Sequence, residues 1–430
     1  MTTPSRLDRE LEAWLAADGP SVARPEVVDV AIAAARRLPQ SRDWLGPLRL
    51  PVTFGSSRRL GVVLIGLMAL ALLAGAIYLA GSRVTTPLPR ANGWLAYSNG
   101  SEIVAIEPGG SARRTLVAAP ADIVVDAPAF SPDGQWLAYW RTNADGTSAI
   151  GLVAMAADGR DVTDLVDFGA DFNTAGQPAP ADGVIAWSPD SRRIAVASAN
   201  RFSSSFYVLI VGLDGRSTSV STGAVFGGDV VWSPDGSQFV VRGHLQSQAT
   251  VGLWLVNTGG TGQIRPLSPQ DGLEFDYLRP EFSPDGREVL VFRAPVSSGQ
   301  HDIVAFSVAS GARRDISTDP ADEFWPAWSP DGRYVAWQAD AGNGLTEVFV
   351  SEATGANKRL ITTTSDPVGV GPMVWSPDGR SIVLMSCRSR SNCNASLLIL
   401  PVVSGGIRLE QPVTQLVLNA PRLEFSWQAR

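Results

Sequence analysis

The sequence predicts an all-β fold, a seven-bladed β-propeller, and three observations lead to this prediction. An aromatic residue followed by Ser-Pro-Asp, and usually by Gly, occurs six times in the 430 residues. The copies are separated by 45 to 57 residues, a period typical of propellers and related repeat arrays. The stretches that flank the six copies match complementary parts of the same repeat, which adds a seventh unit.

Each repeat contains four short strands separated by turn residues. In the copy at Trp328, strands are expected at 325–328, 334–337, 347–350 and 359–362. In the Ser-Pro-Asp-Gly turn, Pro holds φ at about −65°, Asp bonds nearby backbone amides and Gly accepts a positive φ. We therefore interpret the aspartates as structural residues of the turns. They are Asp133, Asp190, Asp235, Asp285, Asp331 and Asp378.

The two ends of the repeat region predict how the ring closes. Residues 94–97, 103–106 and 114–117 match the second, third and fourth strands of a repeat. Residues 423–427 match an isolated first strand. Three N-terminal strands and one C-terminal strand would form the seventh blade, and this pairing removes the free strand edges that promote aggregation.

A membrane anchor is predicted before the propeller. Leu60 to Gly81 is a run of 22 residues without a charge, long enough to cross about 30 Å of hydrocarbon as a helix. More arginines precede this run closely than follow it, which places the N-terminus in the cytoplasm. We predict a cytoplasmic helical arm at 1–59, a transmembrane helix at 60–81, a linker at 82–91 and an extracytoplasmic propeller at 92–430.

The repeat resembles that of the TolB-like, WD-repeat-like propeller family over about residues 92–430. The resemblance rests on the aromatic-Ser-Pro-Asp-Gly pattern and the alternating apolar strand after it, and it implies the fold. TolB is a soluble periplasmic six-bladed propeller that acts with a Pal-type lipoprotein. The anchor and the seventh blade depart from that pattern, so the partner is not implied here.

The N-terminal arm resembles the cytoplasmic heads of bacterial transmembrane anti-sigma factors, through its Trp-Leu-Ala-Ala-Asp-Gly-Pro run. Zinc-binding members of that family use a cluster of His and Cys, and residues 1–59 contain neither. The arm is therefore expected to be either a simple juxtamembrane segment or a docking segment for a cytoplasmic partner, without zinc.

Composition argues against several functions. A net charge of −7 and a pI near 5.1 do not suit a nucleic-acid surface. The sequence contains only two histidines, His244 and His301. This number argues against a histidine metal site and does not favour a catalytic triad. No Gly-x-Ser-x-Gly or His-Glu-x-x-His motif occurs, and the turn acids lie one per blade, unlike calcium ligands. We predict no metal, no cofactor and no catalytic residue.

Two loops carry candidate binding residues. Cys387 and Cys393 are the only cysteines, and in an oxidising compartment they are expected to form a disulfide. The loop that they would close carries Arg388 and Arg390, either as recognition residues for an anionic partner or as solvated charges. The insertion that makes the first repeat longest carries Asp171, Phe172 and Asn173, in either a binding loop or a passive one.

These features predict a non-catalytic binding module at the bacterial cell envelope, with a protein or glycan as partner, and not an enzyme. One alternative is a transmembrane sensor or regulator in which the propeller detects a ligand and the arm responds. Another is an enzyme with its site at the mouth of the propeller channel.

Overall fold

The computed structural model describes residues 91–429 apart from 110–111, 145–148, 168–178, 181–183, 201–204, 222–223, 246–250, 260–263, 269–274, 296–299, 343, 365–370, 387–393, 403–417 and 420–424. All described residues belong to one compact unit, Ser82–Arg430. The predicted arm at 1–59, the predicted transmembrane helix at 60–81 and nearly all of the linker lie outside them. Within the described residues, no helix has the length and apolar character needed to span a membrane.

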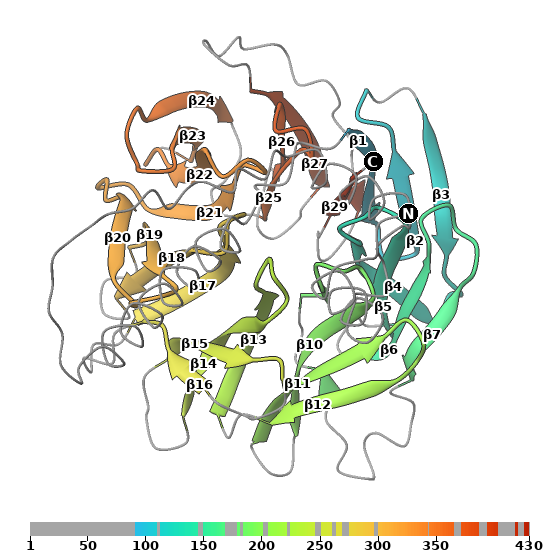
Figure 1. The fold of residues 1–430 in the computed structure, drawn as a ribbon. Coiled ribbons are helices and arrows are strands. Elements are labelled where there is room, and N and C mark those ends of the chain that lie inside the picture. The colour runs from blue at the N-terminus through green and yellow to red at the C-terminus, as the bar shows by residue number, and fades with distance from the viewer. Residues whose placement is uncertain are drawn as a thin grey trace, which may run out of the picture. The chain divides into compact units, whose positions relative to one another are not determined.

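Seven antiparallel sheets form the blades of a ring, as predicted (Figure 1). Six blades have four strands. In the remaining blade the innermost position is divided between two short strands that pair with the same neighbour. The all-β, seven-bladed propeller that the repeat spacing predicts is therefore confirmed.

The blades are numbered 1 to 7 around the ring, and their strands run from the innermost outward. Blade 1 contains β29 (Phe425–Ala429), β1 (Asn92–Ser98), β2 (Glu102–Ile106) and β3 (Arg113–Ala118). Blade 2 contains β4 (Ile123–Phe130), β5 (Trp136–Asn143), β6 (Ala149–Ala156) and β7 (Thr163–Asp167). Blade 3 contains β8 (Ala179–Pro180) and β9 (Ala186–Trp187), then β10 (Arg193–Asn200), β11 (Ser205–Gly212) and β12 (Ser217–Ser221).

The remaining four blades follow the same order. Blade 4 contains β13 (Ala224–Trp232), β14 (Gln238–Leu245), β15 (Gly252–Asn257) and β16 (Ile264–Pro266). Blade 5 contains β17 (Phe275–Phe282), β18 (Glu288–Pro295), β19 (Asp302–Ser307) and β20 (Arg313–Ser317). Blade 6 contains β21 (Glu323–Trp328), β22 (Tyr334–Asp340), β23 (Thr346–Glu352) and β24 (Arg359–Thr364). Blade 7 contains β25 (Met373–Trp375), β26 (Ser381–Ser386), β27 (Asn394–Pro401) and β28 (Leu418–Asn419).

Blade 1 closes the ring by pairing the C-terminal β29 with β1. Trp427 lies opposite Leu95 in this antiparallel pair. The buried Gln428 side chain joins blades 1 and 2: its Oε1 accepts a hydrogen bond from the Trp94 amide at 3.1 Å, and its Nε2 donates to the Gly134 carbonyl at 2.7 Å. Both backbone groups thus gain a partner, and the closure expected from the two chain ends is present.

The six Ser-Pro-Asp turns have one common hydrogen-bond pattern. Each serine hydroxyl donates to the Oδ1 atom of the aspartate two residues later, at 2.5 to 2.7 Å. The same Oδ1 atom accepts the backbone N–H two residues further on. Ser191, which replaces Gly in the second copy, has φ 58°, and its hydroxyl accepts the Asp133 amide at 3.0 Å. A neighbouring blade thus supports the one departure from the pattern.

Hydrophobic clusters fill the spaces between adjacent blades. One cluster joins blades 3 and 4, and another joins blades 6 and 7. The aromatic residue that precedes the turn serine lies in these interfaces, and three tryptophans also donate their indole N–H to the preceding blade. The bonds run from Trp187 to Ala129 O at 2.9 Å, from Trp232 to Ala186 O at 3.0 Å and from Trp375 to Ala327 O at 3.1 Å.

Arginines on outer strands form a second set of contacts between blades. Arg114 on β3 donates to the Ala157 carbonyl at 2.9 Å, and Arg314 on β20 donates to the Ala353 carbonyl at 2.9 Å. Arg265 on β16 makes the same kind of bond to Val308 O. Tryptophans near the ring centre and arginines near its rim therefore hold neighbouring blades together.

Candidate functional site

Four innermost strands, β4, β13, β17 and β21, have a register shift shortly before their Ser-Pro-Asp turn, and three of these shifts are bulges of one kind. The strand register shifts between Asp126 and Ala129 in β4, Leu278 and Glu281 in β17, and Phe324 and Ala327 in β21. At each bulge a non-glycine residue with positive φ precedes a proline: Ala127 at 50°, Arg279 at 50° and Trp325 at 52°. Bulges commonly redirect side chains. In blades 5 and 6 the redirected residues, Arg279 and Trp325, line a pocket.

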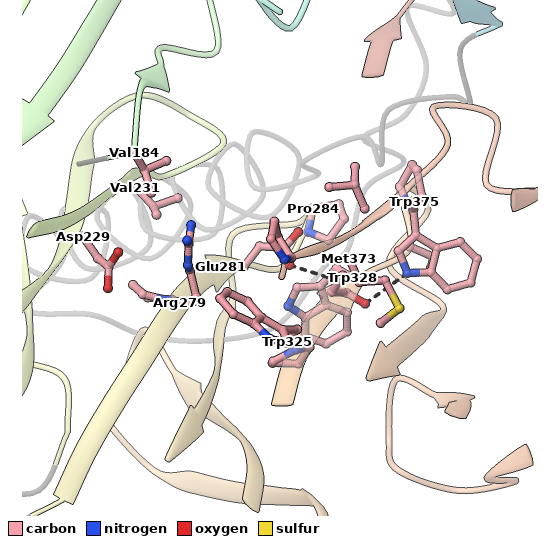
Figure 2. A pocket seen from close by; sticks show the side chains of 17 residues that line it. Val184, Asp229, Val231, Arg279, Glu281, Pro284, Trp325, Trp328, Met373 and Trp375 are labelled. Carbon is pink, nitrogen blue, oxygen red and sulfur yellow. Dashed lines mark hydrogen bonds between the residues drawn. The ribbon is translucent and has the colours of Figure 1, made fainter. Parts of the chain in front are cut away.

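This pocket has a volume of about 450 Å³ and lies between the innermost strands of blades 4 to 7 (Figure 2). Its walls are mainly apolar, with Trp325, Trp328, Trp375 and Met373 beside five prolines. The volume and the apolar lining are typical of sites for small organic ligands. We refer to it as the channel pocket.

A second cavity of about 650 Å³ adjoins the channel pocket. The prolines of five Ser-Pro-Asp turns line it, together with valines, tryptophans and Ala429. Val184, Val231 and Pro330 line both cavities, so their surfaces are continuous. The second cavity has no charged residue in its lining, so of these two cavities only the channel pocket is lined by charged residues.

Glu281 on β17 is the most unusual group in the channel pocket. Its Oε2 accepts a hydrogen bond from the Trp328 amide at 3.1 Å, which Figure 2 shows as a dashed line. Removal of the carboxyl from water raises the pKa of Glu281 to about 8, and the Trp328 N–H only partly opposes this effect. The side chain is therefore mostly a neutral carboxylic acid at pH 7.

The other charged residues of the channel pocket do not neutralise Glu281. The guanidinium of Arg279 lies 5.0 Å from the centre of the Trp325 ring. In Figure 2 the Arg279 side chain lies between Trp325 and Asp229 of β13. Among the described residues, Glu281 forms no ion pair, and the carboxyl stays without a cation beside it.

A second buried acid lies at the junction of blades 5 and 6. Glu323 is completely buried, and its Oε1 accepts hydrogen bonds from Ser317 Oγ at 2.6 Å and Trp337 Nε1 at 2.9 Å. Lys358 Nζ lies 3.8 Å from the same atom and also pairs with Asp319. Burial raises the pKa of Glu323 to about 7, while Ser317 and Lys358 lower it. The paired lysine and the two hydrogen-bond donors favour a structural role.

An acid and a histidine also meet near this junction. His301 Nδ1 lies 2.8 Å from Asp322 Oδ1, and the same oxygen accepts the His301 amide at 2.7 Å. The imidazole packs against the rings of Phe292 and Phe324. The pair therefore joins His301, directly before β19, to the start of β21.

The structure does not gather the sequence-predicted candidates into one site. The six turn aspartates are each bonded within their own turn, and the lining of neither cavity includes them. Within the described ranges, no group of three or more His, Cys, Asp or Glu residues could hold a metal ion. The candidates outside the described residues are Asp171, Phe172, Asn173, Cys387, Arg388, Arg390 and Cys393.

Sequence reasoning missed Arg279, Glu281 and Trp325. One signal was present: Arg279 and Trp325 each precede a proline that stands two residues before the aromatic of the turn motif, where Ala127 stands in blade 2. A large or charged residue at this repeated position could have marked a residue directed towards the ring centre. Glu281 itself stands at a position that the other five repeats fill with alanine or valine, and the removal of its carboxyl from water arises only in the folded ring.

Comparison with known proteins gives relatives of the repeats. No family model matches the chain. The chain is 28% identical over 109 residues to an uncharacterised peptidase, YuxL, of Bacillus subtilis. The aligned region covers 24% of this chain and 16% of the relative. It is 26% identical over 134 residues to dipeptidyl-peptidase 5 of Porphyromonas gingivalis, which covers 29% of the chain and 19% of the relative. The chain thus matches less than a fifth of the length of each.

Similar solved structures establish the fold alone, because their sequence identities are low. An oligogalacturonate lyase in complex with manganese has a TM-score of 0.54 at 14% identity, covering 70% of this chain and 83% of the other. A puromycin-hydrolysing peptidase of Mycobacterium tuberculosis has a TM-score of 0.52 at 14% identity, covering 79% and 55%. TolB of Acinetobacter baumannii is also similar, with a TM-score of 0.47 at 14% identity, covering 68% and 70%.

These comparisons correct two predictions. The chain was predicted to be a non-catalytic binding module and not an enzyme, but the curated relatives are named peptidases, so both predictions are wrong. The repeats describe how the ring is built. A fold alone does not determine function, because function depends on the sites that the fold carries.

Proposed function

We propose that the chain acts in peptide hydrolysis and that its propeller binds the peptide at the ring centre. The observation that carries this proposal is the channel pocket, which combines aromatic and proline walls with a few polar groups. Such a lining suits a segment of peptide, whose apolar side chains need burial and whose polar groups need orientation. The names of the two curated relatives support the same class of reaction.

The two adjoining cavities give a peptide a continuous path. A bound side chain would occupy the channel pocket between Trp325 and the neighbouring prolines. The rest of the segment would extend along the proline-lined cavity, which adjoins the pocket at Val231 and Pro330. In this arrangement the propeller supplies binding and positioning, and Trp325 is a binding residue.

A cleavage assay on a peptide mixture tests the proposal. The purified full-length chain is incubated with synthetic peptides of varied sequence, and the products are identified by mass spectrometry. We expect defined cleavage products. Trp325→Ala should raise KM about tenfold and change kcat little, because it removes a wall of the site and no reacting group.

A matched control is Val162→Ala, since Val162 is an exposed apolar residue with 59% of its surface accessible. This variant should cleave the peptides with native KM and kcat. Intact peptides after prolonged incubation would contradict the proposed hydrolysis. Cleavage with an unchanged KM in Trp325→Ala would instead contradict the channel pocket as the binding site.

We also propose that residues 60–81 anchor the propeller outside the cytoplasm. The uncharged run and the arginines that precede it support this topology. Protease added to intact cells should digest the propeller and leave residues 1–59 protected, as detected by antibodies to each part. Digestion of the arm with protection of the propeller would reverse the orientation.

A further inference from the structure

Within the described part of the chain, no cationic side chain pairs with the carboxyl of Glu281. One carboxyl oxygen, Oε2, accepts the Trp328 amide, and Oε1 has no hydrogen-bond partner among the described residues. The nearest arginine in the same strand, Arg279, stacks on Trp325 instead. An ionised carboxyl that is removed from water is unfavourable unless a cation or a hydrogen-bond donor lies beside it. Because Glu281 lines an open pocket, a bound ligand could supply this partner.

The surroundings of Glu281 define the ligand further. Three indole rings, those of Trp325, Trp328 and Trp375, line the pocket around it (Figure 2). Indole faces attract cations, and Arg279 already uses the Trp325 ring in this way. The volume of about 450 Å³ exceeds what a bare ion needs and suits a small organic molecule.

We propose that the channel pocket binds a small organic cation, a protonated amine carried on an apolar or aromatic body. The ammonium lies against Glu281 Oε1, where it favours the ionised carboxylate and supplies its counter-charge. The apolar body packs against the tryptophans and prolines of blades 6 and 7. This inference goes beyond peptide hydrolysis, because it concerns binding and is tested without turnover.

Binding should be coupled to release of a proton. The free carboxyl is mostly protonated at pH 7, and an ammonium beside it favours the ionised form. The charged residues lining the pocket are Asp229 from β13 and Arg279 and Glu281 from β17, while β21 and β25 contribute apolar residues. Arg279 lies between Asp229 and Trp325 in Figure 2, and Glu281 is the acid that the three tryptophans surround.

Isothermal titration calorimetry with the full-length chain tests the inference. The probe is phenethylamine, and its neutral counterpart is 2-phenylethanol. We expect saturable binding of the amine, at least tenfold weaker binding of the alcohol and at least tenfold weaker binding of the amine to Glu281→Gln. Titrations in buffers of different ionisation enthalpy measure the number of protons released on binding. Because the pKa of Glu281 is about 8, about 0.9 proton should be released per bound amine at pH 7 and about 0.1 at pH 9.

The control variant is Glu352→Gln, which changes an exposed acid at the end of β23 and should bind the amine with native affinity. If Glu281→Gln does not fold, the proton release of the native protein decides the question alone. Absence of saturable amine binding would overturn the inference. Equal binding of the alcohol, unchanged affinity in folded Glu281→Gln, or no proton release at pH 7 would overturn it as well.

Discussion

Single residues of this propeller show how strongly burial changes the chemistry of a carboxyl group. Glu281 and Glu323 belong to neighbouring blades, and burial raises the pKa of both. Glu323 has a lysine and two hydrogen-bond donors around it, whereas Glu281 has one amide. Glu323 is therefore interpreted as a structural group, and Glu281 as part of the channel pocket.

Glu323→Gln should gain stability relative to the native protein as the pH rises. The pKa of Glu323 is about 7 in the folded protein and ordinarily 4.5. Between these two pH values the carboxyl loses its proton in the unfolded chain but keeps it in the folded protein, so the native protein becomes less stable as the pH rises. Glutamine does not titrate. The difference in free energy of unfolding between variant and native protein should shift towards the variant by up to about 3 kcal/mol.

Urea unfolding at pH 4.5 and pH 8 measures this shift. Other titrating groups are common to both proteins and cancel in the difference. A difference that does not depend on pH would show that Glu323 keeps its ordinary pKa in the folded state.

Gly134 and Gly236 occupy the same turn position in different surroundings. Their φ angles are 69° and 71°, a region that costs a residue with a side chain about 1 kcal/mol. A Cβ atom on Gly134 would lie 1.8 Å from the Ala429 carbonyl oxygen, whereas on Gly236 the nearest atom would be Pro189 Cδ at 3.7 Å. Only the first substitution would also push β29 away from blade 2.

Gly236→Ala should therefore lower the free energy of unfolding by about 1 kcal/mol, and Gly134→Ala by about 3 kcal/mol or more. Chemical denaturation of the two variants under the same conditions measures the difference. Equal losses would mean that blade 1 does not contact the turn at Gly134 as described.

At the level of elements, each turn serves its own blade and a neighbouring one. In each turn the serine and aspartate bond to each other, and in three of the six turns the tryptophan before them also bonds to the blade that precedes it. The sequence predicts the first role from turn chemistry and the packing of the aromatic residue from its repetition. The bonds from indole to carbonyl could not be predicted, because they depend on the distance between strands about 46 residues apart.

Trp375→Phe should be more destabilising than Trp328→Phe, by about 1 kcal/mol. The indole N–H of Trp375 donates to Ala327 O, which phenylalanine would leave without this donor. In the described part of the chain, the buried Nε1 of Trp328 has no hydrogen-bond partner, so its loss removes only packing. Thermal unfolding of both variants tests the difference, and a larger loss in Trp328→Phe would contradict it.

At the level of the whole molecule, closure of the ring depends on the contacts of the last strand. The last strand pairs with β1, and Gln428 adds bonds to the backbone of blades 1 and 2. Because a propeller without its closing blade exposes strand edges, these contacts protect against self-association as well as unfolding.

Gln428→Leu should lower stability by about 2–4 kcal/mol, since it leaves the half-buried Trp94 N–H and the buried Gly134 C=O without their partner. Gln338→Leu is the matched control: it removes a buried bond from Nε2 to Gly371 O, at 3.3 Å, away from the closing blade. Both variants should be less stable. Only Gln428→Leu should self-associate, as size-exclusion chromatography with light scattering would detect.

If Gln428→Leu is less stable than the native protein but remains monomeric, the closing role of blade 1 is contradicted. Self-association of Gln338→Leu to the same extent would show that loss of stability alone is sufficient.

The sequence by itself determined the strand content, the number of blades and the closing blade, because local turn chemistry and the apolar alternation repeat in every unit. It did not determine the channel pocket or its chemistry. Asp229, Glu281, Trp325 and Trp375 come from four different blades, and only closure of the ring brings them around one cavity. The raised pKa of Glu281 has the same origin, since neighbouring blades remove that carboxyl from water.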